Sequence, residues 1–78
     1  MTESEFFRLI EECAGVPEGT IDGSTVLGGL STWDSMTVVG FIAAVDEHLD
    51  IVLRATDLAV AKKADDLCAL VRSRLTNS

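Results

Sequence analysis

The sequence predicts an all-α protein: a small four-helix bundle with three longer helices, one short helix and a long ordered loop between the first two. Three observations support this fold class. Apolar residues recur at the spacing of a helix in separate stretches of the chain. Residues that favour helix ends stand at the borders of these stretches. The 78 residues have the length of one small domain, so we expect a single domain over residues 1–78.

The composition is that of a globular, acidic protein. Hydrophobic residues make up 47% of the chain and charged residues 24%, which argues against a disordered chain. Thirteen acidic against six basic residues give a net charge of -7, which repels nucleic-acid phosphates but suits basic partners. The acidic start is unlike a signal peptide, and no apolar run approaches the roughly 20 residues of a membrane helix. We therefore expect a cytoplasmic monomer with no membrane span and no nucleic-acid partner.

The first helix is expected to begin after Thr2 and to close at Gly15. Thr2 and Glu5 have the spacing of a capping box. Gly15 can end the helix, and Pro17 prevents its continuation. The predicted buried stripe consists of Phe6, Leu9, Ile10, Cys13 and Ala14. The other face is acidic and is expected to be solvated: Glu3, Glu5, Glu11 and Glu12.

Residues 16–32 are rich in Gly, Ser and Thr and predict an ordered loop that crosses the core and contains one helical turn. A loop of this length in a small domain has to be held in place. Four apolar residues are expected to hold it: Ile21, Val26, Leu27 and Leu30. Phe7 lies off the main stripe of the first helix, so we expect it to bury against this loop.

The second helix is expected to run from Ser35 to about Leu49, with Asp34 as its N-cap. Its apolar residues supply more than one stripe: Met36, Val39, Phe41, Ile42, Val45 and Leu49. Such a helix is either buried or presents a hydrophobic face to a partner. His48 lies in the last turn, where a structural role is expected.

The remaining chain predicts a loop and two further helices. Residues 50–54 lack strand-like alternation and are interpreted as an apolar loop. Thr56 is expected to cap a short helix over residues 57–61, and a solvated lysine pair separates it from a fourth helix over residues 64–75. The predicted buried stripe of this fourth helix consists of Ala64, Leu67, Cys68, Leu70, Val71 and Leu75.

Ser35 is the candidate functional residue, because its hydroxyl lies at a helix N-terminus, where N–H groups and the helix dipole favour a phosphate. The same Asp-Ser pair is also compatible with a plain helix cap. His48, the single histidine, follows thirteen residues later on the same helix, roughly 20 Å away, so a Ser-His catalytic pair is excluded. Cys13 and Cys68 match no metal spacing and are interpreted as small buried hydrophobes, with a disulfide left open. We therefore predict no catalytic residue, no metal site and no enzyme activity of the chain alone.

The order of elements, the acidity and two segments resemble the acyl carrier protein family. Asp34, Ser35 and Met36 match the Asp-Ser-Leu or Asp-Ser-Met motif that opens the second helix in that family. Residues 45–50 match the hydrophobic-acidic-acidic-x-hydrophobic-Asp end of the same helix, and residues 51–53 match the apolar segment after it. The resemblance covers nearly the whole chain and implies an acyl carrier protein-like bundle.

The resemblance implies a covalent cofactor and a set of partner enzymes. In that family, a phosphopantetheinyl transferase uses coenzyme A and a magnesium ion to attach 4′-phosphopantetheine to the motif serine, here Ser35. The terminal thiol then carries acyl or aminoacyl groups as thioesters for a ligase, a synthase or an acyltransferase. The side chain of Asp34 is expected to point away from the phosphate, because the two charges repel each other.

Several positions depart from fatty-acid carriers and favour a specialised polyketide-like or nonribosomal pathway. Three residues separate Leu30 from the motif instead of two, and Trp33 stands before it as in some stand-alone carriers. Thr37 and Gly40 occupy positions that are acidic in fatty-acid carriers, and Arg54 replaces a common proline. Two alternatives stay open: a D-alanyl carrier of cell-envelope modification, and an unmodified helical adaptor protein.

The partner-binding face is expected to surround Ser35 and to follow the second helix. Trp33 is expected to anchor the preceding loop, and Asp34 to cap the helix or to meet the transferase. Val38 and Ala43 are expected on the exposed apolar flank, with Met36 near the attachment point. Acids appear only at the far end of this helix, as Asp46 and Glu47.

Overall fold

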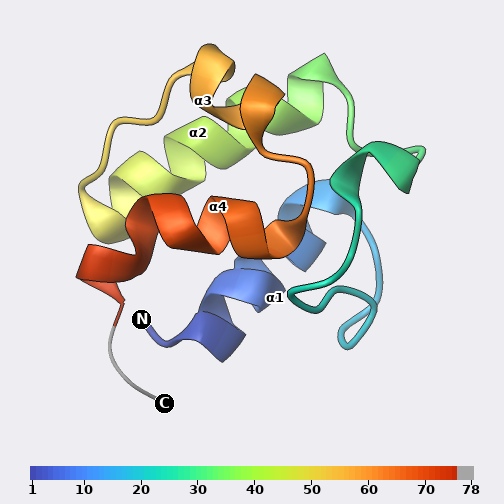
Figure 1. The fold of residues 1–78 in the computed structure, drawn as a ribbon, viewed down its shortest axis with the longest axis horizontal. Coiled ribbons are helices and arrows are strands. Elements are labelled where there is room, and N and C mark those ends of the chain that lie inside the picture. The colour runs from blue at the N-terminus through green and yellow to red at the C-terminus, as the bar shows by residue number, and fades with distance from the viewer. Residues whose placement is uncertain (76–78) are drawn as a thin grey trace.

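The computed structural model describes residues 1–75 and confirms a small all-α bundle (Figure 1). Helix α1 packs against α2 and α4, and the short α3 packs against α2. Two 3-10 turns, η1 and η2, complete the described structure. The elements in chain order are α1 (Glu3–Ala14), η1 (Leu27–Gly29), α2 (Ser35–Leu49), α3 (Ala55–Val60), α4 (Ala64–Val71) and η2 (Arg72–Arg74).

The ends of α1 and α2 lie where the capping residues predict them. The Thr2 hydroxyl oxygen accepts the Glu5 N–H at 3.2 Å, and the Glu5 carboxylate accepts the Thr2 N–H at 2.9 Å. Gly15 closes α1 in the left-handed conformation at φ 70°, which a glycine adopts without steric cost. Helix α2 begins at Ser35 and ends at Leu49.

The predicted cap of the third helix is wrong. Helix α3 begins at Ala55, two residues earlier than expected, so Thr56 lies inside its first turn. The physical reason is the Asp57 carboxylate, which reaches back and accepts the Arg54 N–H at 2.9 Å. This contact satisfies a backbone donor that precedes the first turn.

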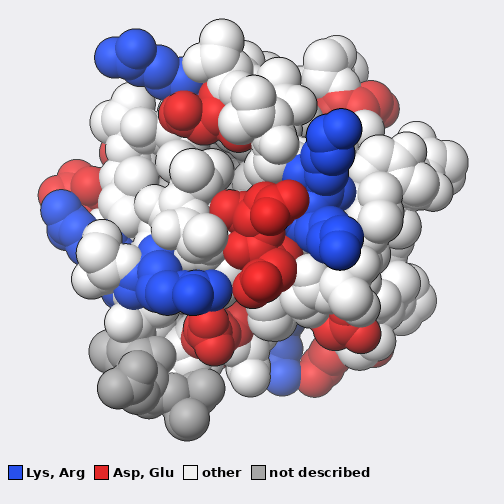
Figure 2. All heavy atoms as spheres, in the orientation of Figure 1, with Lys and Arg blue, Asp and Glu red and all other residues white. Residues whose placement is uncertain are grey.

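Helix α4 begins at Ala64 as predicted but ends at Val71 instead of Leu75. The Asp66 carboxylate accepts the N–H groups of Lys62 and Lys63, both at 3.0 Å, and fixes this start. Residues 72–74 are polar and exposed, so no buried side chain holds a further α-helical turn, and the chain tightens into η2. Figure 2 shows acidic side chains in the middle of this face with basic side chains on either side.

The core lies between the helices and includes an aromatic contact that joins α1 to α2. The rings of Phe6 and Phe41 meet edge to face, with centroids 5.8 Å apart. Leu70 was expected in the buried stripe of α4 but is 40% exposed, because its position faces away from this core. The buried core cluster comprises Phe6, Leu9, Ile10, Ile21, Leu27, Phe41, Val45, Leu49, Leu53, Leu58, Ala64, Leu67, Cys68 and Val71.

The long loop is held by two buried side chains and by backbone hydrogen bonds. Ile21 and Leu27 are buried as predicted, and Leu30 is half-buried against the core. Val26 was expected to be buried but is 53% exposed, because it pairs in an extended conformation with Lys63. Around this pair the Leu27 N–H donates to the Lys62 carbonyl at 2.9 Å, and the Ala64 N–H donates to the Thr25 carbonyl at 2.9 Å. The loop is thus attached to the segment between α3 and α4.

The predicted solvated acidic face of α1 is wrong at Glu11. This residue is only 4% exposed, and its Oε2 atom accepts the Ile21 N–H at 2.9 Å. The reason is that the long loop folds back over α1 at this point. The other acids of that face keep partly or fully exposed positions: Glu3, Glu5 and Glu12.

Candidate functional site

Ser35 is the first residue of α2, and its side chain is exposed. Its hydroxyl has no hydrogen-bond partner among residues 1–75. The N-terminal turn of a 15-residue helix presents unpaired backbone N–H groups and a partial positive charge there. A free nucleophilic oxygen and a place for an anion therefore coincide at one point of the surface.

Asp34 caps α2, as the sequence predicts. Its Oδ1 atom accepts the Thr37 N–H at 2.9 Å. This hydrogen bond lowers the pKa of the Asp34 carboxyl below its usual value, so the group is charged at neutral pH. Because the carboxylate is directed to the Thr37 amide, it leaves the Ser35 hydroxyl free.

The chain that leads into α2 is fixed by two contacts. The Thr37 hydroxyl donates to the Thr32 carbonyl at 2.7 Å, across the start of the helix. Trp33 is half-buried, and its ring meets Phe41 edge to face with centroids 5.7 Å apart. The structure therefore gives Trp33 the anchoring role that the sequence predicts for it.

An apolar surface surrounds Ser35. Met36 is 83% exposed and Val39 is 66% exposed. Together with Ser35 these two residues line a shallow hollow of about 240 Å³. Large apolar side chains with this exposure, gathered beside one hydroxyl, are typical of a surface that contacts a ligand or a partner.

The predicted exposed flank of α2 is correct at Ala43 and wrong at Val38. Val38 is half-buried and packs against the core, because it precedes Phe41 by three residues and Val45 by seven on the same helical face. Val39 takes the exposed position instead. The exposed face then continues at spacings of three and four residues through Val39, Ala43, Asp46 and Glu47. The turn-by-turn phase set by the buried Phe41 and Val45 is the signal that identifies Val39.

A second hollow, which sequence reasoning missed, lies between the long loop and α3. It has a volume of about 340 Å³ and Trp33 forms one of its walls. Its other lining residues are Val26, Leu27, Gly28, Leu58, Ala59, Ala61 and Lys62. No local pattern predicts this hollow, because it depends on the pairing of the loop with the segment before α4.

The other reactive side chains lie away from Ser35 or are unreactive. His48 is exposed in the last turn of α2, at the opposite end of that helix from Ser35. Cys13 and Cys68 are free thiols, and burial raises the pKa of both. Within residues 1–75 no group of three His, Cys, Asp or Glu residues could hold a metal ion. In the same described part, no helix has the length and apolar character needed to cross a membrane.

Comparisons of the chain with models of protein families, with curated proteins and with solved structures gave no match. The functional assignment therefore depends on the residues described above. These are an exposed Ser35, a capping Asp34, and the apolar pair formed by Met36 and Val39.

Proposed function

We propose that this chain is an acyl carrier protein that holds acyl or aminoacyl groups as thioesters on a 4′-phosphopantetheine arm attached to Ser35. The observation that carries the proposal is the exposed, unpaired Ser35 hydroxyl at the first residue of α2. The Asp-Ser-Met motif and the ending of α2 at residues 45–50, which resemble the carrier family, support it.

The residues present fit a phosphodiester at this position. The N–H groups that open α2 favour an anion bound to the Ser35 oxygen. The Asp34 carboxylate is engaged with Thr37. Met36 and Val39 offer apolar contact to the arm beyond the phosphate. When attached, the arm supplies a terminal thiol, which neither of the two cysteines could replace because burial raises the pKa of both.

The chain contributes the hydroxyl but no base to activate it. His48 is at the other end of a 15-residue helix, roughly 20 Å from Ser35. The group that removes the Ser35 proton therefore has to come from a phosphopantetheinyl transferase. In this proposal the chain is a substrate of that enzyme and of acyl-loading enzymes, and it catalyses no step itself.

The proposed setting is a specialised polyketide-like or nonribosomal pathway in the cytoplasm, where the carrier acts as a monomer. Trp33 before the motif, and the uncharged Thr37 and Gly40 after it, favour this setting over a fatty-acid synthase. A D-alanyl carrier shares the Asp-Ser-Met motif and the neutral start of α2. Identification of the ligase or synthase that loads the chain would distinguish the two.

An unmodified helical adaptor is the second candidate, because Met36 and Val39 are exposed and apolar. An adaptor would use this apolar surface without any need for the Ser35 hydroxyl. The two functions are separated by incubation with coenzyme A, magnesium and a promiscuous transferase, followed by intact-mass spectrometry. A carrier gains the mass of one phosphopantetheine group, whereas a chain that stays unmodified would overturn the carrier proposal.

A further inference from the structure

Glu11 is a buried carboxylate without a cationic partner among residues 1–75. It is 4% exposed and is the buried charged residue of that part of the chain. The ion pairs of the described residues join Arg8 to Glu18, and Arg72 to Glu3 and Asp65, so none of them includes Glu11. Buried charges in proteins are normally paired, because removal from water is costly. A neutral N–H from Ile21 compensates this charge only in part.

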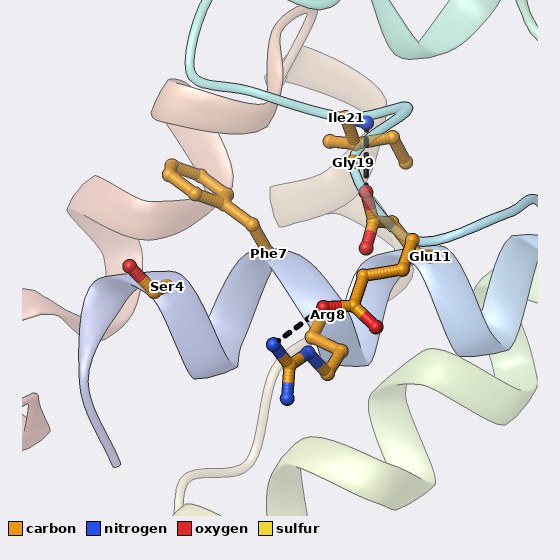
Figure 3. Close-up of a pocket in the computed structure, with 7 residues that line it drawn as sticks. Ser4, Phe7, Arg8, Glu11, Gly19 and Ile21 are labelled. Carbon is orange, nitrogen blue, oxygen red and sulfur yellow. Dashed lines mark hydrogen bonds and ion pairs between the residues drawn. The ribbon is translucent and has the colours of Figure 1, made fainter.

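The Glu11 carboxylate lies in a pocket between α1 and the long loop. The pocket has a volume of about 200 Å³. Figure 3 shows Ser4, Phe7 and Glu11 projecting from α1 toward the segment that carries Gly19 and Ile21. The Ile21 N–H occupies Oε2 of Glu11, which leaves Oε1 as an acceptor for a ligand. The aromatic ring of Phe7 forms an apolar wall beside it.

The charges that line the pocket leave one negative charge uncompensated. Two carboxylates, Glu11 and Glu18, face one guanidinium, Arg8, and the sum is therefore -1. Arg8 is committed to Glu18 at 2.7 Å on the exposed rim. The remaining negative charge thus belongs to the buried carboxylate of Glu11. A single cation of suitable size would neutralise the pocket.

We propose that this pocket binds a primary ammonium group at the end of an alkyl chain. An ammonium has three donors, and the pocket offers Oε1 of Glu11 and the Ser4 hydroxyl as acceptors. The ring of Phe7 favours both the apolar stem and the charge at its end. Two sources present this chemistry: a lysine side chain of a partner protein and a free alkylamine. The site shares no residue with the Ser35 surface and does not rest on the carrier function.

The probe for the experiment is n-butylammonium, which reproduces a lysine side chain, with n-butanol as its uncharged control. Titration is followed by the amide signals of Gly19 and Ile21 in nuclear magnetic resonance spectra at low salt. Glu11→Gln keeps an acceptor for the Ile21 N–H but removes the charge, so the ammonium should bind about tenfold more weakly. Glu12→Gln makes the same change at an exposed neighbour and should leave the affinity unchanged.

Arg8→Gln should change the affinity in the opposite direction. This exposed substitution releases Glu18 and raises the negative charge of the pocket, so the ammonium should bind severalfold more tightly. Because it removes no core contact, it tests the proposal even if Glu11→Gln fails to fold. Equal or weaker binding by Arg8→Gln would contradict the proposal.

Three further results would overturn the site: no shift of the Gly19 and Ile21 signals, unchanged affinity in folded Glu11→Gln, or equal binding of n-butanol. A capped lysine amide, which carries the ammonium on a peptide backbone, distinguishes the two sources. If it binds as well as n-butylammonium, the site accepts a lysine of a partner protein. If it is excluded while n-butylammonium binds, the ammonium site stands and its ligand is a small free amine.

Discussion

The carboxylate of Asp34 turns to the Thr37 N–H at 2.9 Å, and the hydroxyl of Ser35 directly after it stays exposed without a partner among residues 1–75. Two neighbouring polar side chains at one helix start thus have separate roles. Asp34 satisfies an N–H group of α2, and Ser35 is left available for chemistry. The first four predictions below concern the stability and the surface of this helix, and the last concerns Ser35 itself.

Removal of the Asp34 cap should destabilise the fold without disturbing it elsewhere. Asp34→Ala leaves the Thr37 N–H without its acceptor, and the melting temperature should fall by roughly 5 °C. Asp34→Asn is the matched control, because asparagine also caps well but carries no charge. Thermal melts followed by circular dichroism measure both variants. Equal loss in Asp34→Ala and Asp34→Asn would mean that the charge, and not the cap, stabilises this helix start.

Acid should weaken the fold through carboxylates that accept hydrogen bonds. Backbone N–H groups lower the pKa of Glu5, Asp34 and Asp66, and the Ser24 hydroxyl lowers the pKa of Asp22. Because the pKa is lower in the folded than in the unfolded state, these groups add stability above about pH 4.5. This contribution is lost as the pH falls through the folded pKa values.

Urea unfolding at about pH 6 and about pH 3 measures this effect, with a lower midpoint expected at the acidic pH. The Asp34→Asn variant cannot titrate at this position and should lose less stability over the same interval. A midpoint that is constant or rises on acidification would show that relief of the -7 net charge outweighs the four hydrogen-bonded carboxylates.

Salt should stabilise the protein. A net charge of -7 on 78 residues implies self-repulsion in the folded state, which dissolved ions screen. The described ion pairs lie at exposed positions and contribute at most about 1 kcal/mol each, so their screening costs little. Melting temperatures in dilute buffer, moderate sodium chloride and magnesium chloride test this. A melting temperature that falls or stays constant as salt is added would count against the prediction.

The exposed apolar face of α2 should dominate docking to the enzyme that loads or unloads the carrier. Val39→Asp places a charge on a residue that is 66% exposed, so the fold should persist while transfer to the cognate enzyme fails. Asp46→Asn removes only one exposed charge and should have a smaller effect. The neighbouring Val38→Asp places a charge against the core and should cost about 2 kcal/mol of stability.

Circular dichroism establishes which of these variants are folded, and transfer rates with the cognate enzyme then compare them. If folded Val39→Asp transfers normally while Asp46→Asn or added salt abolishes transfer, docking is electrostatic. That result would favour the mode expected of fatty-acid carriers over the specialised pathway proposed here.

Local signals in the sequence predict the parts of the fold that local contacts determine. The bounds of α2 follow from Asp34 and from a periodic apolar pattern, and the start of α1 follows from its capping box. Exposure of Ser35 at the helix start follows from the same cap. At Thr56 the local rule failed, because a competing carboxylate one residue later captured the preceding N–H group.

Contacts between distant segments could not be predicted in the same way. Glu11 lies on the polar face by helical periodicity, but the long loop covers it through the Ile21 N–H. Val26 looks like a core residue, yet its pairing with Lys63, 37 positions later, turns it outward. The exposure of Val39 in place of Val38 shows that an apolar run reveals its buried face only once the packing partners are known.

The central claim, that Ser35 carries a phosphopantetheine arm, is tested most directly by intact-mass spectrometry of the native chain and of Ser35→Ala. Both are incubated with coenzyme A, magnesium and a promiscuous transferase, after circular dichroism has shown that the variant is folded. Because the Ser35 hydroxyl contacts no other described residue, this substitution should not disturb the bundle. The native chain should gain the mass of one phosphopantetheine group and Ser35→Ala none. An unmodified native chain, or a fully modified Ser35→Ala variant, would contradict the assignment.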